Sequence, residues 1–211
     1  MKNIFSPPSI DDLIRLLRAW RFWLVTALLG ALIGAAIHYI VPPPYQARAT
    51  VNVDFNMEQA WPQDTDRQQF YYLERETRKL EEIAWSDAVM QAVAKADGKA
   101  SVRELREVKL QLSQPAEAGW HFYAVDANPK RAESLASTWA QAFTDAARAN
   151  LSTQGGLSSF IQLDATQSSN LPKQRSVSIS VYLLVGMLGT WFLGAFVFLF
   201  FDFGAKKKDE K

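Results

Sequence analysis

Hydrophobic residues gather in two long runs, one near each end of the chain. Residues 22–41, FWLVTALLGALIGAAIHYIV, carry no formal charge, and residues 177–201 form a second run of the same kind. Each run is long enough to cross the roughly 30 Å hydrocarbon layer of a bilayer as a helix. The first run is too long for the apolar part of a cleaved signal peptide, and patterned sequence precedes it. The pattern therefore predicts two transmembrane helices.

Basic residues flank both runs on the terminal sides. Arg15, Arg18 and Arg21 precede the first run, and the second run is followed by Lys206, Lys207, Lys208 and Lys211. Short segments rich in Lys and Arg remain on the cytoplasmic side of a membrane. Both termini are therefore predicted to be cytoplasmic, with residues 42–176 on the other side and residues 202–211 as a short basic tail.

Residues 1–21 also have a helical pattern. Ser9 is a candidate N-cap, and the apolar residues after it recur at helical spacing: Ile10, Leu13, Ile14, Leu17 and Trp20. This pattern predicts an amphipathic helix on the cytoplasmic membrane surface. A simple N-terminal extension of the first transmembrane helix is the alternative, and either form would anchor the chain.

The first transmembrane run ends at three prolines and is followed by an alternating pattern. Pro42, Pro43 and Pro44 lack a backbone donor and stop the helix, and Tyr45 suits the membrane interface. From Ala47 to Phe55, small or apolar residues alternate with polar ones. This period of two predicts a half-buried strand that begins directly at the membrane boundary.

The region from 56 to 176 predicts a mixed domain. A linker leads to a helix with apolar positions at Phe70, Leu73, Thr77, Leu80 and Ala84. Ser86 is the N-cap of a second helix that ends at Gly98, and Ser101 with Glu104 forms a capping box for a short turn. Two strands follow, over residues 108–114 and 119–127.

A long helix is predicted next, with Asn128 as its cap and Pro129 as its first residue. Its apolar stripe comprises Ala132, Leu135, Ala136, Trp139, Phe143 and Ala146, and Gly155 and Gly156 stop it. A short strand near residues 159–165 and a polar link complete the domain. The fold class is therefore α+β, a small α/β domain flanked by two transmembrane helices, whose first and last strands are expected to lie side by side.

Composition and motifs give no support for catalysis. The net charge of +1 gives no reason to expect nucleic acid binding, and the absence of cysteine excludes disulfides and thiol chemistry. His38 and His121 have no metal-ligand spacing, and Asp64 and Asp66 lie in a predicted acidic loop. The chain has no P-loop, dinucleotide fingerprint or nucleophile elbow. We therefore expect a protein that is not an enzyme and has no cofactor or metal.

Small residues recur at every fourth position in both apolar runs. The first run has Thr26, Gly30 and Gly34, with His38 next in the series, and the second has Gly186, Thr190 and Gly194. Such stripes let another helix approach closely. They are predicted to be helix-packing sites, and the spacing leaves open whether the contact lies within one chain or between chains.

The order of these parts resembles the Wzz-type chain length determinants, also called polysaccharide co-polymerases. The stretch PPPYQARATVNV resembles the family's boundary between first span and strand, and DANPKRAESLASTWAQAF resembles its D-x-x-P-x-x-A element through Asp126, Pro129 and Ala132. SDAVMQAVAKA is similar to the family's serine-initiated helix. The family's proline-rich link before the second span is reduced to Leu171 and Pro172. Long members of the family carry an extended helical arm. The longest helix predicted here is under about forty residues, so the resemblance is to a compact member.

The resemblance implies a bacterial inner-membrane protein with a periplasmic central domain. Family members form rings and set the length, or permit the export, of a surface polysaccharide made by a separate polymerase. The expected partners are other copies of the chain, the membrane, and the polymerase or growing glycan. The alternatives are a modulator of a separate cytoplasmic tyrosine kinase and a two-span sensor with a borrowed output module. An enzyme acting on lipid-linked sugars ranks last.

Overall fold

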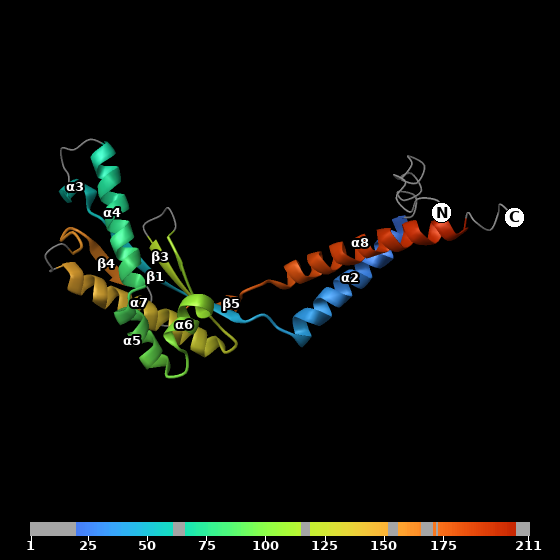
Figure 1. Cartoon of the computed structure of the whole chain (residues 1–211), viewed down its shortest axis with the longest axis horizontal. Helices are drawn as coiled ribbons and strands as arrows, with labels where there is room; N and C mark the ends of the chain where they lie inside the picture. The colour runs from blue at the N-terminus through green and yellow to red at the C-terminus, as the bar shows by residue number, and fades with distance from the viewer. Residues whose placement is uncertain are drawn as a thin grey trace. The chain divides into compact units, whose positions relative to one another are not determined.

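The computed structural model describes residues 20–60, 66–114, 119–151, 156–165, 171 and 173–205. The chain divides into two units, a terminal unit of residues 1–43 and 177–211 and a central domain of residues 44–176. Figure 1 shows the elements of each unit along the chain. The amphipathic helix expected within residues 1–19 and most of the basic tail lie outside the described residues.

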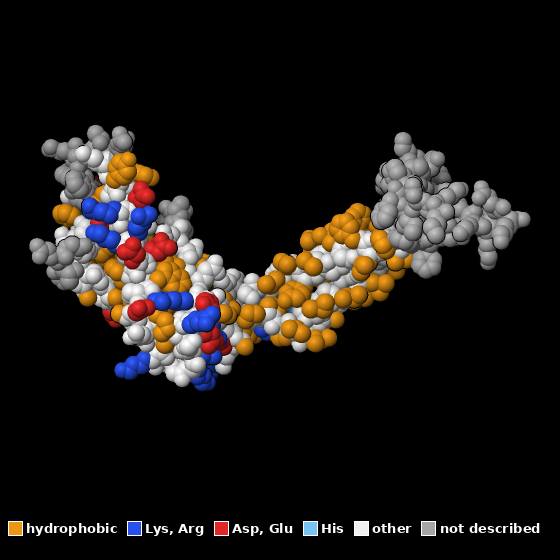
Figure 2. All heavy atoms as spheres, viewed as in Figure 1, with side chains coloured by type: hydrophobic (Ala, Val, Ile, Leu, Met, Phe, Trp, Pro, Cys, Tyr) orange, Lys and Arg blue, Asp and Glu red, His pale blue; other side chains and the backbone are white. Residues whose placement is uncertain are grey.

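The terminal unit contains two apolar helices, α2 (Trp20–Ile40) and α8 (Ile179–Ala205). Both are long and apolar enough to cross a membrane. Most of their large hydrophobic side chains are exposed, and orange spheres dominate the surface of this unit in Figure 2. An exposed apolar belt of this size is stable in lipid and unfavourable in water. Both helices lie at the predicted positions, with boundaries shifted by one to four residues.

The central domain is built on one antiparallel sheet. Its strands are β1 (Tyr45–Asp54), β2 (Leu110–Ser113), β3 (Gly119–Asp126), β4 (Gln162–Ala165) and β5 (Lys173–Arg175). The strand order is β2-β3-β1-β4, and β5 pairs with β1 beside Tyr45. Strand β1 therefore lies at the centre and contacts both of the last two strands.

Helices cover one face of this sheet. They are α3 (Met57–Ala60), α4 (Asp66–Ala84), α5 (Asp87–Asp97), α6 (Val102–Glu104), which continues into the π-helix η1 (Leu105–Lys109), and α7 (Pro129–Leu151). Figure 1 shows α7 lying along the strands, with α5 beside it. The alternate residues of β1 pack beneath α7 because successive strand side chains point to opposite faces. The other face of the sheet is polar, with Arg48 and Asn52 exposed on it.

Local capping explains where the helices begin and end. The Ser86 hydroxyl accepts a hydrogen bond from the Val89 amide, and α5 ends at Gly98, whose φ of 67° is in the left-handed region. The Ser101 hydroxyl accepts from the Glu104 amide. Asn128 caps α7 by accepting from the Lys130 amide, and Pro129 is the first helical residue. These caps occur at the predicted positions.

The predicted fold class, α+β with two candidate membrane-spanning helices, is confirmed, and the two strands expected to be neighbours are paired. Four details differ. The predicted linker after β1 contains α3, and the predicted polar link contains β5, the strand that precedes α8. Helix α7 ends at Leu151, before Gly155 and Gly156, and Ala147 rather than Ala146 is fully buried.

The exposed face of α4 is the largest difference between the structure and the sequence prediction. Periodicity places Phe70 and Leu73 on the buried side, but they are 63% and 39% exposed. The buried side instead follows Tyr72, Glu76, Leu80 and Ala84. Leu80 and Ala84 lie on both patterns, so the C-terminal half of the helix packs as predicted and the N-terminal half does not. A carboxylate, Glu76, therefore occupies a position that the sequence pattern would assign to an apolar residue.

Candidate interaction sites

The small residues of α2 and α8 face one another within the chain. Gly30 lies against Gly186, Gly34 against the backbone of Tyr182, and Gly194 against Thr26. Residues later in α2 contact residues earlier in α8, so the two helices are antiparallel. A Cβ atom on Gly30 would lie closer than 3.0 Å to Thr190 Oγ1 and to the carbonyl oxygen of Gly186. Only glycine allows the two backbones to approach this closely.

Polar and aromatic contacts accompany this close approach. The Thr190 hydroxyl lies 2.9 Å from the carbonyl oxygen of Thr26 and 2.9 Å from that of Gly186 in its own helix. A hydroxyl has one hydrogen, so it donates to one of these at a time. Trp23 and Trp191 pack edge to face with ring centroids 5.6 Å apart, and His38 packs on Tyr182 at 5.1 Å. The helices are thus joined along most of the described length.

The two ends of the central domain lie side by side. Tyr45 pairs with Arg175 across β1 and β5, and the Ser176 amide donates to the carbonyl oxygen of Pro44 at 2.9 Å. The Arg175 guanidinium lies 3.8 Å from the centroid of the Tyr45 ring. A cation over an aromatic face stabilises this pairing. The domain therefore begins and ends at the same end of the sheet, next to the segments that lead to α2 and α8.

The other residues predicted for the membrane boundary differ in burial. Pro42 and Pro44 are exposed, whereas Pro43 is buried. Leu171 is 2% exposed and belongs to the core of the central domain, where its amide donates to Glu133. Pro172 lies outside the described residues.

A charged cluster surrounds the D-x-x-P-x-x-A element. Asp126 Oδ1 accepts from the Asn128 amide, and its Oδ2 contacts Lys109 Nζ at 2.7 Å and Arg131 Nη1 at 3.1 Å. Arg131 also donates to both oxygens of Asp97 at 2.7 Å. The element therefore fixes the turn from β3 into α7 and ties α7 to the end of α5.

Electrostatics keep these buried carboxylates charged. The Arg131 guanidinium lowers the pKa of Asp97 to about 2, against the opposing effect of burial. Burial raises the pKa of Asp126, but hydrogen bonds from Lys109 and the Asn128 amide outweigh it and leave that pKa below its ordinary value. Asp97 in turn raises the pKa of Arg131. The cluster is a structural ion-pair network.

We expect this network to make the stability of the central domain depend on pH in the acid range. A carboxyl whose pKa is lowered by folding contributes stability above its unfolded value, near 4, and loses it as the pH falls to about 2. Asp97→Asn should reduce the free energy of unfolding by about 2 kcal/mol at neutral pH and flatten its acid dependence. Denaturant titrations of the detergent-solubilised protein between pH 2 and 7 measure both effects.

The matched control is Asp87→Asn on the same helix. Asp87 forms an ion pair with Arg106, but its side chain is 78% exposed, so the effect should be small at every pH. If the free energy of unfolding of Asp97→Asn varied with pH in parallel with that of the wild type, Asp97 would not be a source of the acid dependence.

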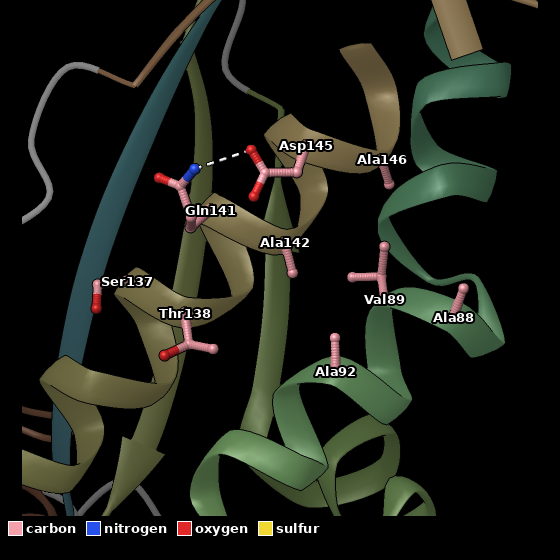
Figure 3. Close-up of a pocket in the computed structure, with 9 residues that line it drawn as sticks. All are labelled: Ala88, Val89, Ala92, Ser137, Thr138, Gln141, Ala142, Asp145 and Ala146. Atoms are coloured by element: carbon pink, nitrogen blue, oxygen red, sulfur yellow. Dashed lines mark hydrogen bonds between the residues drawn. The ribbon is translucent and has the colours of Figure 1, made fainter. Parts of the chain in front are cut away.

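A shallow groove of about 640 Å³ separates α5 and α7. Figure 3 shows small side chains on both walls, with Val89 and Ala92 of α5 on the side of Ala142 and Ala146 of α7, and Ala88 at the far end of the lining. Ser137, Thr138, Gln141 and Asp145 form its polar side, where Gln141 donates to Asp145 at 2.9 Å. Small side chains on two helices leave room for a further element to pack between them.

A second pocket, of about 270 Å³, lies between α4 and the segment 156–160. Its lining combines aromatic, charged and hydroxyl side chains, and the buried Glu76 is at its base. The sequence patterns assigned no binding role to these residues. The only signal in the sequence was the unusual position of Glu76, one turn after Tyr72 and one turn before Leu80 on the same side of α4.

The polar residues singled out for possible chemistry are not brought together. His121 lies on β3, where its Nδ1 is 3.0 Å from the Thr50 hydroxyl, and burial together with the Arg48 charge lowers its pKa. Asp64 lies outside the described residues, and Asp66 is the first residue of α4 rather than part of a loop. In the part of the chain that the structure describes, no group of three His, Asp or Glu side chains is arranged to hold a metal ion.

The fold and these sites define a protein with two candidate membrane helices and an α+β domain between them. Residues 10–96 match the family model of Wzz, the chain length determinant protein. A comparison with curated proteins gives no match. The resemblance inferred from the sequence is thus confirmed over the region from the N-terminal segment through α5. The match supports a role in setting polysaccharide chain length, and with the two apolar helices it indicates an inner-membrane protein.

Proposed function

We propose that the protein is a non-catalytic, self-associating membrane scaffold that regulates the chain length or export of a surface polysaccharide. The match to the chain length determinant family over residues 10–96 is the observation that carries this proposal. Both termini are cytoplasmic and the central domain is periplasmic, as the basic flanks of the two apolar runs indicate. The partners are other copies of the chain, the membrane, and a polymerase or its growing glycan.

The arrangement of the helix pair and the domain ends supports a scaffold. The glycine contacts between α2 and α8 hold two antiparallel helices together, and the pairing of β1 with β5 fixes both ends of the domain at the same end of the sheet. Each copy is thereby anchored at two adjacent points. Subunits anchored in this way can pack side by side around a closed ring and present one repeated surface.

The apolar end of α4 is the surface that we assign to self-association. Phe70, Tyr71 and Leu73 are 63%, 56% and 39% exposed, although the sequence pattern marks Phe70 and Leu73 for burial. The groove between α5 and α7 offers small side chains that a protruding aromatic residue can pack against. Contact between α4 of one copy and the groove of the next is heterologous, which is the type of contact that closes a ring.

Deletion of the gene should change the length distribution or export of the host's surface polysaccharide, and restoration of the wild-type gene should recover it. Restoration with the Phe70→Glu/Leu73→Glu variant should not recover the profile, because two charges would replace the apolar contact surface between copies. The same variant should give smaller oligomers when the purified protein is sized in nanodiscs. Polysaccharide gels and native sizing measure the two effects.

The matched control places two new carboxylates on α5 at positions that do not line the groove. Gln91 and Lys95 are both exposed and lie outside the groove lining, so Gln91→Glu/Lys95→Glu adds the same residues without touching the proposed contact. This control should restore the polysaccharide profile as the wild type does. An unchanged profile after deletion would favour the kinase-modulator and sensor alternatives. A wild-type protein that remains monomeric in nanodiscs would contradict the ring.

A further inference from the structure

The pocket between α4 and the segment 156–160 has the chemistry of a ligand site. Four of its lining residues come from α4 (Tyr72, Arg75, Glu76 and Lys79) and four from the other segment (Gly156, Ser158, Ser159 and Phe160). Its volume of about 270 Å³ lies just below the roughly 300–1,000 Å³ of pockets that hold drug-sized ligands. The size therefore suits a single sugar unit.

Glu76 holds several groups of the pocket lining in place through hydrogen bonds. Its side chain is 0% exposed, with Oε1 accepting from Arg75 Nε at 2.8 Å and Lys79 Nζ at 3.1 Å, and Oε2 accepting from the Ser158 amide at 3.0 Å. Burial raises the pKa of Glu76, but these hydrogen bonds outweigh it and hold the pKa below its ordinary value. Lys79 also donates to the carbonyl oxygen of Gly156 at 2.6 Å. Both cations are thus held in fixed positions.

The charge balance of the lining favours an anion. Arg75 and Lys79 contribute two positive charges, and Glu76 contributes one negative charge that is already hydrogen-bonded. The Arg75 side chain is 60% exposed, uses Nε for Glu76, and lies with its guanidinium carbon 5.8 Å from the centroid of the Tyr72 ring. A guanidinium edge of this kind matches the two oxygens of a carboxylate.

The remaining groups suit the rest of a sugar. Ser158 and Ser159 supply hydroxyls, which can both donate and accept as sugar hydroxyls do, and Ser158 Oγ already accepts from the Phe160 amide at 3.4 Å. The Phe160 ring is 41% exposed and gives an apolar surface for the C–H face of a pyranose. An anion alone would need the two cations but neither the aromatic ring nor the hydroxyls.

We propose that this pocket binds an acidic sugar unit of a polysaccharide, such as a hexuronate, with its carboxylate on Arg75 and Lys79 and its ring against Phe160. The proposal rests on the proposed function in one respect, that a glycan is the partner. It adds the chemical class of the glycan and the place where it binds.

The test measures binding of three probes to the full-length protein in nanodiscs by isothermal titration calorimetry. The probes are an oligosaccharide of glucuronic acid, a glucose oligosaccharide of the same length, and inorganic phosphate. We expect the acidic oligosaccharide to bind at least about tenfold more tightly than either other probe. Arg75→Gln and Phe160→Ala should each weaken its binding about tenfold or more.

The matched control is Arg78→Gln, which removes the same charge from an exposed position of α4 outside the pocket lining. It should bind like the wild type. Equal binding of the acidic and neutral oligosaccharides, or no effect of Arg75→Gln, would overturn the proposal. Phosphate binding as tight as the acidic oligosaccharide would show a simple anion site and would also overturn it.

The binding experiment and the gene deletion test the two proposals separately. An unchanged polysaccharide profile after gene deletion would refute the proposed function, whatever the binding data show. A changed profile together with no selective binding of the acidic oligosaccharide would refute only the pocket assignment.

Discussion

Replacement of Trp139 with alanine is expected to unfold the central domain or leave it barely stable. Trp139 is fully buried in α7, and its ring packs on Phe122 of β3 and Trp85 at centroid distances of 4.9 and 4.8 Å. Removing a buried tryptophan side chain costs about 3–5 kcal/mol, because contacts are lost and a cavity remains. That loss is a large fraction of the roughly 5–15 kcal/mol by which a typical domain is stable.

Urea unfolding of the detergent-solubilised protein, followed by far-ultraviolet circular dichroism, measures the loss. Trp139→Phe is the milder variant for comparison, because it keeps most of the aromatic packing. It keeps an aromatic ring but removes the Nε1 donor, which bonds the carbonyl oxygen of Ala84 at 2.9 Å. It should cost about 1–3 kcal/mol, clearly less than alanine. A loss below about 1 kcal/mol for Trp139→Ala would contradict the position of this residue at the centre of the core.

Gly30→Leu is expected to separate α2 from α8. Its side chain would overlap Thr190 Oγ1 and the carbonyl oxygen of Gly186, and the backbone atoms of α8 cannot move aside without shifting the helix. Overpacking a close contact costs about 1–3 kcal/mol, and more when backbone must move. Because membrane helices associate through close packing rather than the hydrophobic effect, this cost acts directly on the pairing.

Cross-linking measures the separation cleanly because the chain has no cysteine. Cysteines placed at positions 23 and 191, whose rings now pack together, can be joined by a short bismaleimide in the wild-type background. Gly30→Leu should reduce the yield severalfold. Gly189→Leu is the control, since a Cβ atom at Gly189 meets nothing within 4 Å. Equal yields in both variants would show that the glycine contact does not hold the pair.

Much of this architecture follows from local patterns in the sequence. Two uncharged apolar runs, three prolines at the end of the first run, and the alternation from Ala47 to Asp54 specify helix, stop and strand without reference to any distant residue. Ser86, Gly98 and Asn128 mark helix ends because caps satisfy backbone groups only a few residues away. Interactions of this short range can be read from sequence alone.

The tertiary structure decided what depends on distant partners. Strand β5 is a three-residue segment in a polar link, and it is a strand because all three of its residues pair with the start of β1, 126 or more positions earlier in the sequence. The glycine stripes allow contact within or between chains, and the fold places α2 against α8 of the same chain. Burial of Glu76 likewise depends on the amide of Ser158, which lies 82 residues away in the sequence.

The exposed end of α4 also combines a feature set by local sequence with one set by tertiary structure. Local periodicity in the sequence determined that α4 is a helix with apolar residues at Phe70 and Leu73. Which side of the helix is buried was decided by the tertiary fold, which brings the Ser158 amide against Glu76 and so helps to satisfy the buried carboxylate. In that fold Tyr72 and Glu76 are buried, and Phe70 and Leu73 lie on the surface.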